Sequence, residues 1–268
     1  MSRSLFFTML KVHGKSIASY TIGSTFYLLL IVMIYPSVSN VKGLNDIIAA
    51  MPENFLKAFG IEGGLSSLSD FLAGEYYGLL LLVILSIYCM TTATGSLAKL
   101  VDNGSMAYLL ATPNSRVKIS FTQAVLGIVG LFIIIGVTTL AGILGGEYLI
   151  ETSDFDKMAF IQMNVAAFFL FFVISSYSFF FSALMNDEKK ALSLPAALTI
   201  VFYACDLIGK MSEKFEWMRS LSLFSLFNPI EIGRGNEDIF MFCILFGLIG
   251  IAIYTLSILI FSKRDLPL

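Results

Sequence analysis

The segment Lys99–Lys118, KLVDNGSMAYLLATPNSRVK, lies between two long apolar runs and differs from both in mixing polar and apolar residues. Asp102 and Asn103 are residue types that cap helix N-termini. Apolar residues at the spacing of one helix face follow them: Met106, Leu109, Leu110 and Pro113. Because the residue before a proline avoids helical backbone angles, Thr112-Pro113 ends the helix. The pattern predicts a short helix over about residues 102–113 that inserts into another protein at the membrane surface.

The composition is that of a membrane protein. Of the 268 residues, 57% are hydrophobic and 13% are charged, whereas soluble domains are about a quarter charged. The net charge of -2 and the lack of a basic stripe argue against a nucleic-acid partner. Cys89, Cys205 and Cys243 all fall in apolar runs, so we expect buried free thiols. The chain is therefore expected to be an all-α, polytopic membrane protein.

Six apolar runs are long enough to cross the hydrocarbon core, which takes about 20 helical residues. The predicted spans are residues 17–36, 76–98, 119–145, 158–185, 190–208 and 239–262. Residues 1–16 place Leu5 and Met9 on one side, which predicts an amphipathic helix lying on the membrane surface. No linker divides the sequence, so residues 1–268 are expected to form a single transmembrane domain.

The basic residues predict the orientation. Many of the 17 lysine and arginine residues fall in short segments flush with one side of the six spans. They are Arg3, Lys11, Lys15, Lys99, Arg116, Lys118, Lys189, Lys190, Lys263 and Arg264. Cytoplasmic segments next to spans are enriched in Lys and Arg. We therefore predict a multi-pass protein of the cell membrane with both termini in the cytoplasm.

Three stretches together carry a family resemblance. The motif of Asp102, Gly104, Tyr108-Leu109-Leu110, Thr112-Pro113 and Ser115-Arg116 resembles the first cytoplasmic loop of ABC-2 type permeases. Those proteins are the six-span membrane halves of ABC transporters. Phe227-Asn228-Pro229 before the last span and the ending Phe261–Leu266 agree with the family. The resemblance covers most of the chain.

The resemblance implies a contact with a cytoplasmic ABC ATPase through the loop after the second span. The implied contact residues are Asp102, Gly104, Met106, Tyr108, Leu109, Leu110, Thr112, Pro113 and Arg116. The tight turn over residues 186–190 carries Asp187 and Glu188, which we expect to form a second, smaller cytoplasmic contact.

The implied function is that of the permease subunit of an ATP-driven exporter. Its substrate would be amphipathic or hydrophobic, such as a peptide, a drug or a lipid. Two ATPase copies would bind ATP and Mg²⁺, so we expect no cofactor, metal or enzymatic activity on this chain. A second permease copy, or a sister permease, would complete the path within the membrane lipids.

The second and fifth spans of such permeases line the path between two copies. Their polar residues are therefore the expected lining: Thr91, Thr94, Thr199 and Tyr203. Phe169 and Phe171, on the fourth span, are expected to face lipid instead.

Two other functions are consistent with six spans. The first is an immunity or sensor subunit that recruits an ATPase without transporting anything. The second is an ion-driven carrier, but no carboxylate near the membrane centre pairs with a lysine, as an ion relay would require. Gly14-Lys15-Ser16 matches the end of a phosphate-binding loop, but such a loop needs a glycine five positions earlier, where this sequence has Met9. We therefore do not expect ATP to bind there.

Overall fold

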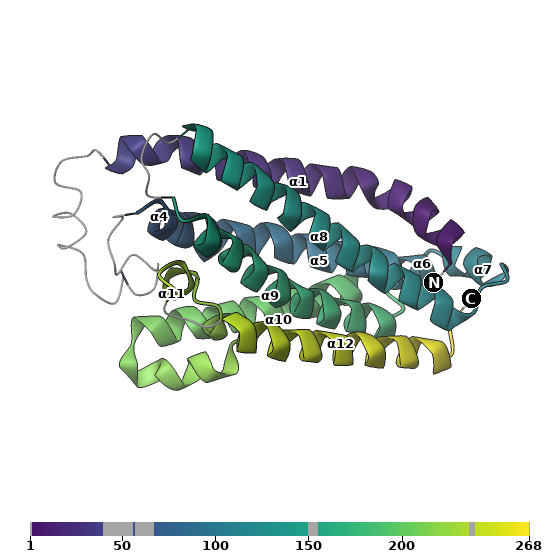
Figure 1. Cartoon of the computed structure of the whole chain (residues 1–268). Helices are drawn as coiled ribbons and strands as arrows, with labels where there is room; N and C mark the ends of the chain where they lie inside the picture. Colours follow the sequence, from purple (N-terminus) through teal and green to yellow (C-terminus); the bar gives the residue numbers. More distant parts are fainter. Residues whose placement is uncertain (1, 40–55, 57–66, 150–154, 236–238, 268) are drawn as a thin grey trace.

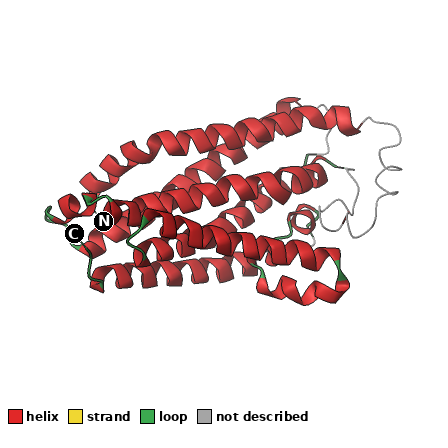
Figure 2. Cartoon of the chain, turned by 180° about the vertical axis from the view of Figure 1, so that it is seen from behind, coloured by secondary structure: helices red, strands yellow, loops and turns green. Residues whose placement is uncertain are grey.

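The computed structural model describes residues 2–39, 56, 67–149, 155–235 and 239–267, and every regular element among them is a helix (Figures 1 and 2). The long helices are α1 (Arg3–Ser39), α5 (Leu81–Ser96), α8 (Arg116–Leu149), α9 (Lys157–Leu184), α10 (Glu188–Met211) and α12 (Ile239–Lys263). The shorter elements are α4 (Leu68–Glu75), η1 (Tyr76–Leu80), α6 (Ala98–Asp102), α7 (Ser105–Leu110), η2 (Glu213–Leu221), η3 (Leu223–Leu226) and α11 (Pro229–Gly233). Within these described ranges, six helical segments are long and apolar enough to cross a membrane, which confirms the predicted all-α, polytopic fold.

The helices that contain the first two predicted spans begin before those spans, at Arg3 and Leu68. Residues 3–16 are part of α1 and do not form a separate helix. The proline of α1, Pro36, lies near the C-terminal end, so no proline interrupts the helix before the first span. The second span begins at α4, where the Ser67 hydroxyl accepts a hydrogen bond from the N–H of Asp70 at 3.0 Å. It passes through one turn of π-helix, η1, before α5 completes it.

Helix α9 lies in the middle of the bundle and packs against α5, α8, α10 and α12 (Figure 1). Phe171 is 0% exposed within it, so the prediction that this residue faces lipid is wrong. Helix α1 packs along α8, and Gly142 of α8 allows this packing because a Cβ there would overlap Leu28 and Phe160. The core is therefore built around the fourth span.

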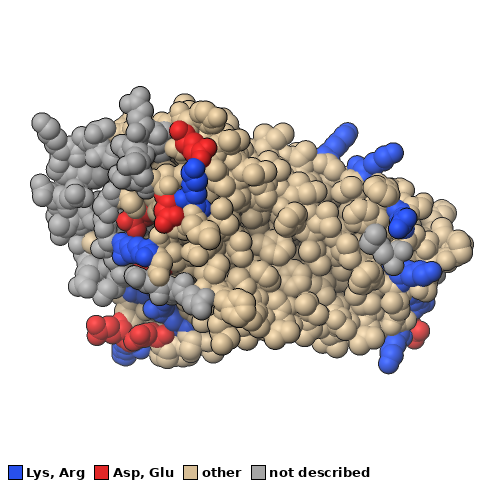
Figure 3. Space-filling view, viewed as in Figure 1, with Lys and Arg blue, Asp and Glu red and all other residues tan. Residues whose placement is uncertain are grey.

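Both chain termini lie at the end of the bundle that carries α6 and α7 (Figure 1). In the space-filling view, the charged side chains at this end are mainly Lys and Arg, whereas the opposite end carries both signs (Figure 3). We call the first the α7 end and the second the α11 end. The charge asymmetry agrees with the pattern behind the predicted orientation, while the side of the membrane remains a prediction.

Candidate functional site

The predicted helix over 102–113 is a turn followed by a shorter helix. Gly104 lies between α6 and α7 with φ of 73°, a left-handed conformation that glycine adopts without a steric penalty. The N-cap of α7 is Gly104 and not Asp102 or Asn103, although the side chain of Asn103 accepts a hydrogen bond from the N–H of Ser105 at 3.0 Å. Helix α7 ends at Leu110, and the Thr112 hydroxyl donates to the carbonyl of Leu109 at 2.5 Å.

The apolar face of α7 is turned into the protein. Met106 is 0% exposed and packs in the cluster that includes Leu97 and Ile119. Leu109 and Leu110 are partly buried against the same cluster. We expected this face to enter a partner, but in the isolated chain Met106 fixes the loop to its own bundle. Periodicity predicts that a face is buried, not which surface buries it.

Tyr108 is the large side chain that α7 presents outward. It is 80% exposed and belongs to α7 (Ser105–Leu110). Thr112 and Pro113 are also exposed beyond it. An exposed aromatic ring on a short, fixed helix has the properties of an interface anchor, because it brings contact area at a low cost in conformational entropy. Of the predicted contact residues, Tyr108 is best placed to reach another protein.

The two predicted cytoplasmic contacts form one surface. The Asp102 carboxylate accepts a hydrogen bond at 3.0 Å from the N–H of Glu188, the first residue of α10. Lys99 donates to the Glu188 carboxylate, also at 3.0 Å, while Asp187 caps α10 by accepting from the N–H of Lys190 at 2.8 Å. Asp102 was expected to cap the helix that follows it in the sequence. Instead, its carboxylate is the hydrogen-bond acceptor for a free N–H at the start of α10. Sequence spacing could not have shown this, because the partners lie 86 positions apart.

Arg116 and Arg264 connect three chain segments beside this surface. Arg116 donates to the carbonyl of Arg264 at 2.5 Å, and Arg264 donates to the carbonyl of Ala183 at 2.5 Å near the end of α9. A cation is favourable at a helix C-terminus, where carbonyl groups lack partners. Burial lowers the pKa of the Arg264 guanidinium, which nevertheless stays charged at physiological pH. From the sequence, Arg264 was expected to be a cytoplasmic charge in the family-like ending, and its contact with the end of α9 was not predicted.

The predicted path residues separate into two groups. Thr199 and Tyr203 line an apolar groove of about 270 Å³ between α5 and α10. Thr91 is exposed outside that lining, and Thr94 is 3% exposed within the bundle. The groove is also lined by residues outside the predicted path set: Ser86, Ile87, Met90 and Ile200. These residues lie on the outward-facing sides of two neighbouring helices, and that they share a groove is visible only once the two helices are seen side by side.

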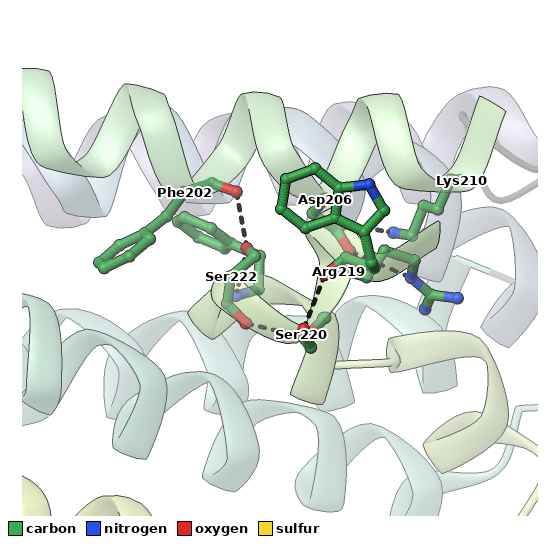
Figure 4. A network of polar contacts seen from close by, with 9 residues as sticks. Phe202, Asp206, Lys210, Arg219, Ser220 and Ser222 are labelled. Atoms are coloured by element: carbon green, nitrogen blue, oxygen red, sulfur yellow. Dashed lines mark hydrogen bonds and ion pairs between the residues drawn. The ribbon is translucent and has the colours of Figure 1, made fainter. Parts of the chain in front are cut away.

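An ion cluster lies at the α11 end of α10 (Figure 4). Asp206 is 4% exposed, and its carboxylate lies 2.7 Å from Nζ of Lys210 and 3.6 Å from Nε of Arg219. Arg219 comes from η2, which folds back along α10. A Cβ on Gly209 would overlap Arg219, so the glycine permits this close approach. This buried carboxylate thus has two cationic partners.

Comparison with known proteins adds one match. The family model described as ABC-2 family transporter protein matches residues 8–266, which include the α6–α7 loop, the groove and the ion cluster. No curated protein matches the chain significantly.

Among the described residues, no group of three or more His, Cys, Asp and Glu side chains could hold a metal ion.

Proposed function

Because the chain belongs to the ABC-2 family of transporter proteins, it is a membrane subunit of an ABC transporter, and we propose that it exports an amphipathic or hydrophobic substrate. ATP and Mg²⁺ would be bound by a separate cytoplasmic ATPase, and ATP hydrolysis there would drive transport. Two ATPases would act on two permease subunits, either identical copies or this chain with a sister permease.

The single observation that carries the proposal is the fixed α6–α7 loop, which presents the exposed ring of Tyr108. The loop lies at the end of the bundle where basic side chains gather, which supports a cytoplasmic location. Met106 and the Asp102–Glu188 hydrogen bond hold it in place before any partner binds. A preorganised loop loses less entropy on binding than a flexible one, so it suits the transmission of ATPase movement.

Replacing the exposed ring tests the ATPase contact. Truncating an aromatic hot spot costs about 2 kcal/mol or more, which weakens binding by about thirtyfold. Tyr108→Ala should therefore reduce co-purification of the co-expressed ABC ATPase while the permease still inserts into the membrane. Tyr148→Ala is the matched control, because Tyr148 is 82% exposed near the opposite end of α8. Equal ATPase recovery with both variants would show that the docking surface lies elsewhere.

Transport distinguishes export from simple ATPase recruitment. Proteoliposomes containing the permease and its ATPase should move a fluorescent amphipathic peptide only when ATP is present. A complex that hydrolyses ATP but moves no peptide, drug or lipid would contradict the exporter proposal and favour an immunity or sensor subunit.

Pairing of two permease subunits can be tested by cross-linking. Thr91 is exposed on the part of α5 that we place toward the second copy, whereas Ile251, 58% exposed on α12, is placed toward lipid. In a background without the native cysteines, Thr91→Cys should cross-link between permease chains and Ile251→Cys should not. The reverse pattern, or a complex with one permease chain by mass, would contradict this arrangement.

A further inference from the structure

A second apolar groove, of about 340 Å³, lies between α1 and α8. These two helices run side by side and pack against one another (Figure 1). The α1 wall of the groove extends from Leu10 to Ile22, and Ile133 of α8 lies opposite. No described residue lines both this α1–α8 groove and the groove between α5 and α10. The α1–α8 groove therefore lies outside the predicted substrate path.

Small residues on α1 leave this space open. Gly14 and Ala18 lie one turn apart in the lining, and a Cβ on Gly14 would meet no atom within 4 Å. Thr21 contributes the hydroxyl group of the lining, and it donates to the carbonyl of Ile17 at 2.8 Å. Because that hydroxyl is hydrogen-bonded within its own helix, the surface of the groove suits a hydrocarbon chain.

The length of the groove matches one leaflet of a bilayer. From Leu10 to Ile22 the axis of α1 rises by about 18 Å, while the hydrocarbon of one leaflet is about 15 Å thick, half of the bilayer core. The edge of the groove is open, since Ala18 is exposed and Ile22 is 68% exposed. A lipid of the leaflet at the α7 end can therefore enter from the side.

Two lysines continue the open edge toward the α7 end. Lys11 and Lys15 are exposed, and with Ala18 and Ile22 they follow the spacing of one helix face. Neither lysine forms an ion pair with a described residue. Helix α1 contains no Asp or Glu, and Glu147, near the far end, is the one acidic residue of α8. The positive charge beside the groove is therefore uncompensated.

We propose that the α1–α8 groove binds an anionic phospholipid of the leaflet at the α7 end, with an acyl chain beside Gly14 and Ala18 and its phosphate at Lys11 and Lys15. Lysine binds phosphate as a point charge, and its long side chain covers apolar surface while the ammonium group reaches the headgroups. A second copy of the chain is a poorer occupant, because it would bring its own basic α7 end to this edge. The site requires neither transport nor the ATPase.

Photo-crosslinking tests the headgroup contact. The probe is phosphatidylglycerol with a diazirine on its acyl chain, and phosphatidylcholine with the same chain is the neutral comparison, each in nanodiscs of the full-length protein. Phosphatidylglycerol should label peptides of α1 and α8 about fivefold more strongly, or more, because one basic residue beside an anionic lipid already has about this effect.

Charge variants test whether the two lysines cause the preference. Changing both Lys11 and Lys15 to Gln should remove it, whereas changing both to Arg keeps the charge and should retain it. Changing both Lys189 and Lys190 to Gln is the matched control, because it removes two exposed charges at the start of α10, at the same end of the bundle. Loss of the preference in this control would mean that net charge and not the α1–α8 groove attracts the lipid.

The acyl-chain contact has its own pair of variants. Gly14→Leu fills the groove and should lower labelling of α1 and α8 by both probes severalfold. Gly23→Leu makes the same change on α1 outside the lining, where a Cβ would also meet no atom within 4 Å, and should not. Both variants replace a helical glycine with a strong helix former, so neither should weaken α1.

Three further results would overturn the proposal. They are equal labelling by the two probes in the unmodified protein, equal labelling of Gly14→Leu and Gly23→Leu, and no labelling of α1 and α8 because another chain covers the groove. None of these outcomes affects the ATPase contact at Tyr108 or the export of a substrate.

Discussion

At the α7 end, charged side chains satisfy the free backbone groups of helix ends: Asp102 accepts from the start of α10, and Arg264 donates to the carbonyls that end α9. At the α11 end, Asp206 instead makes ion pairs with Lys210 and Arg219 and attaches a folded-back segment to α10. The first arrangement holds loops in place while leaving them accessible to a partner. The second removes a carboxylate from water and thereby fixes η2.

The largest effect is expected from breaking the α11 end. Asp206→Ala removes the buried carboxylate and leaves Lys210 and Arg219 as neighbouring cations. Hydrogen bonds to charged groups contribute about 1.5–3 kcal/mol, so we expect a loss of about 2 kcal/mol. The check is thermal unfolding of the purified protein in detergent, with the exposed Glu216→Ala on η2 as the control. Equal melting temperatures for the two variants would mean that the ion cluster does not hold η2.

At the α7 end, Arg264→Ala should have a somewhat smaller effect. It removes the donor to Ala183 and the cation at the end of α9, for an expected loss of about 1–2 kcal/mol. The neighbouring Lys263→Ala changes the same charge at an exposed residue and should be close to neutral. The measurement is again thermal unfolding. If Lys263→Ala were as damaging, net charge and not the specific hydrogen bond would explain the effect.

Removing the Asp102 cap tests the connection between the loop and α10. Asp102→Ala should cost about 0.5–1 kcal/mol, as other losses of a helix cap do. The sharper measurement is hydrogen exchange at the Glu188 amide, whose N–H loses its acceptor and should exchange faster. Asp102→Asn keeps an acceptor oxygen and should restore much of the protection. Unchanged exchange of the Glu188 amide in Asp102→Ala would show that Asp102 does not connect the loop to α10.

The smallest effect is expected for Lys99→Ala. Its ion pair with Glu188 is largely exposed, and such pairs contribute about 0–1 kcal/mol. We expect a loss of less than about 0.5 kcal/mol, which should shrink further as salt screens the pair. A larger, salt-insensitive loss in thermal unfolding would indicate that Lys99 supports the loop through packing instead of charge.

The six spans could be predicted because a bilayer demands about 20 apolar residues from each crossing helix. Which helix lies at the centre could not, because a lipid-facing helix and a core helix are equally apolar. This is why Phe171 was placed toward lipid although it is buried. The same reasoning applies to Met106, whose apolar spacing indicated burial without showing which protein would provide it.

The polar contacts show a second limit. The cap by Asp187 could be expected from local residue types, since an Asp before a helix commonly caps it. The hydrogen bond that Asp102 accepts and the one that Arg264 donates could not be expected, because each joins segments about 80 or more positions apart. Thr199 and Tyr203 lie on α10, the predicted fifth span, but the groove that they line could not be predicted because α5 forms its second wall.

The hydrogen bond from Glu188 to Asp102 has a thermodynamic consequence. It ties the loop that carries Tyr108 to the first residue of α10, and the same helix forms one wall of the groove. If engagement of Tyr108 changes the affinity of the groove for its ligand by some factor, the bound ligand must change the affinity for the ATPase by that same factor. Titrating the ATPase onto the permease with the groove filled or empty would therefore measure their coupling free energy from either side.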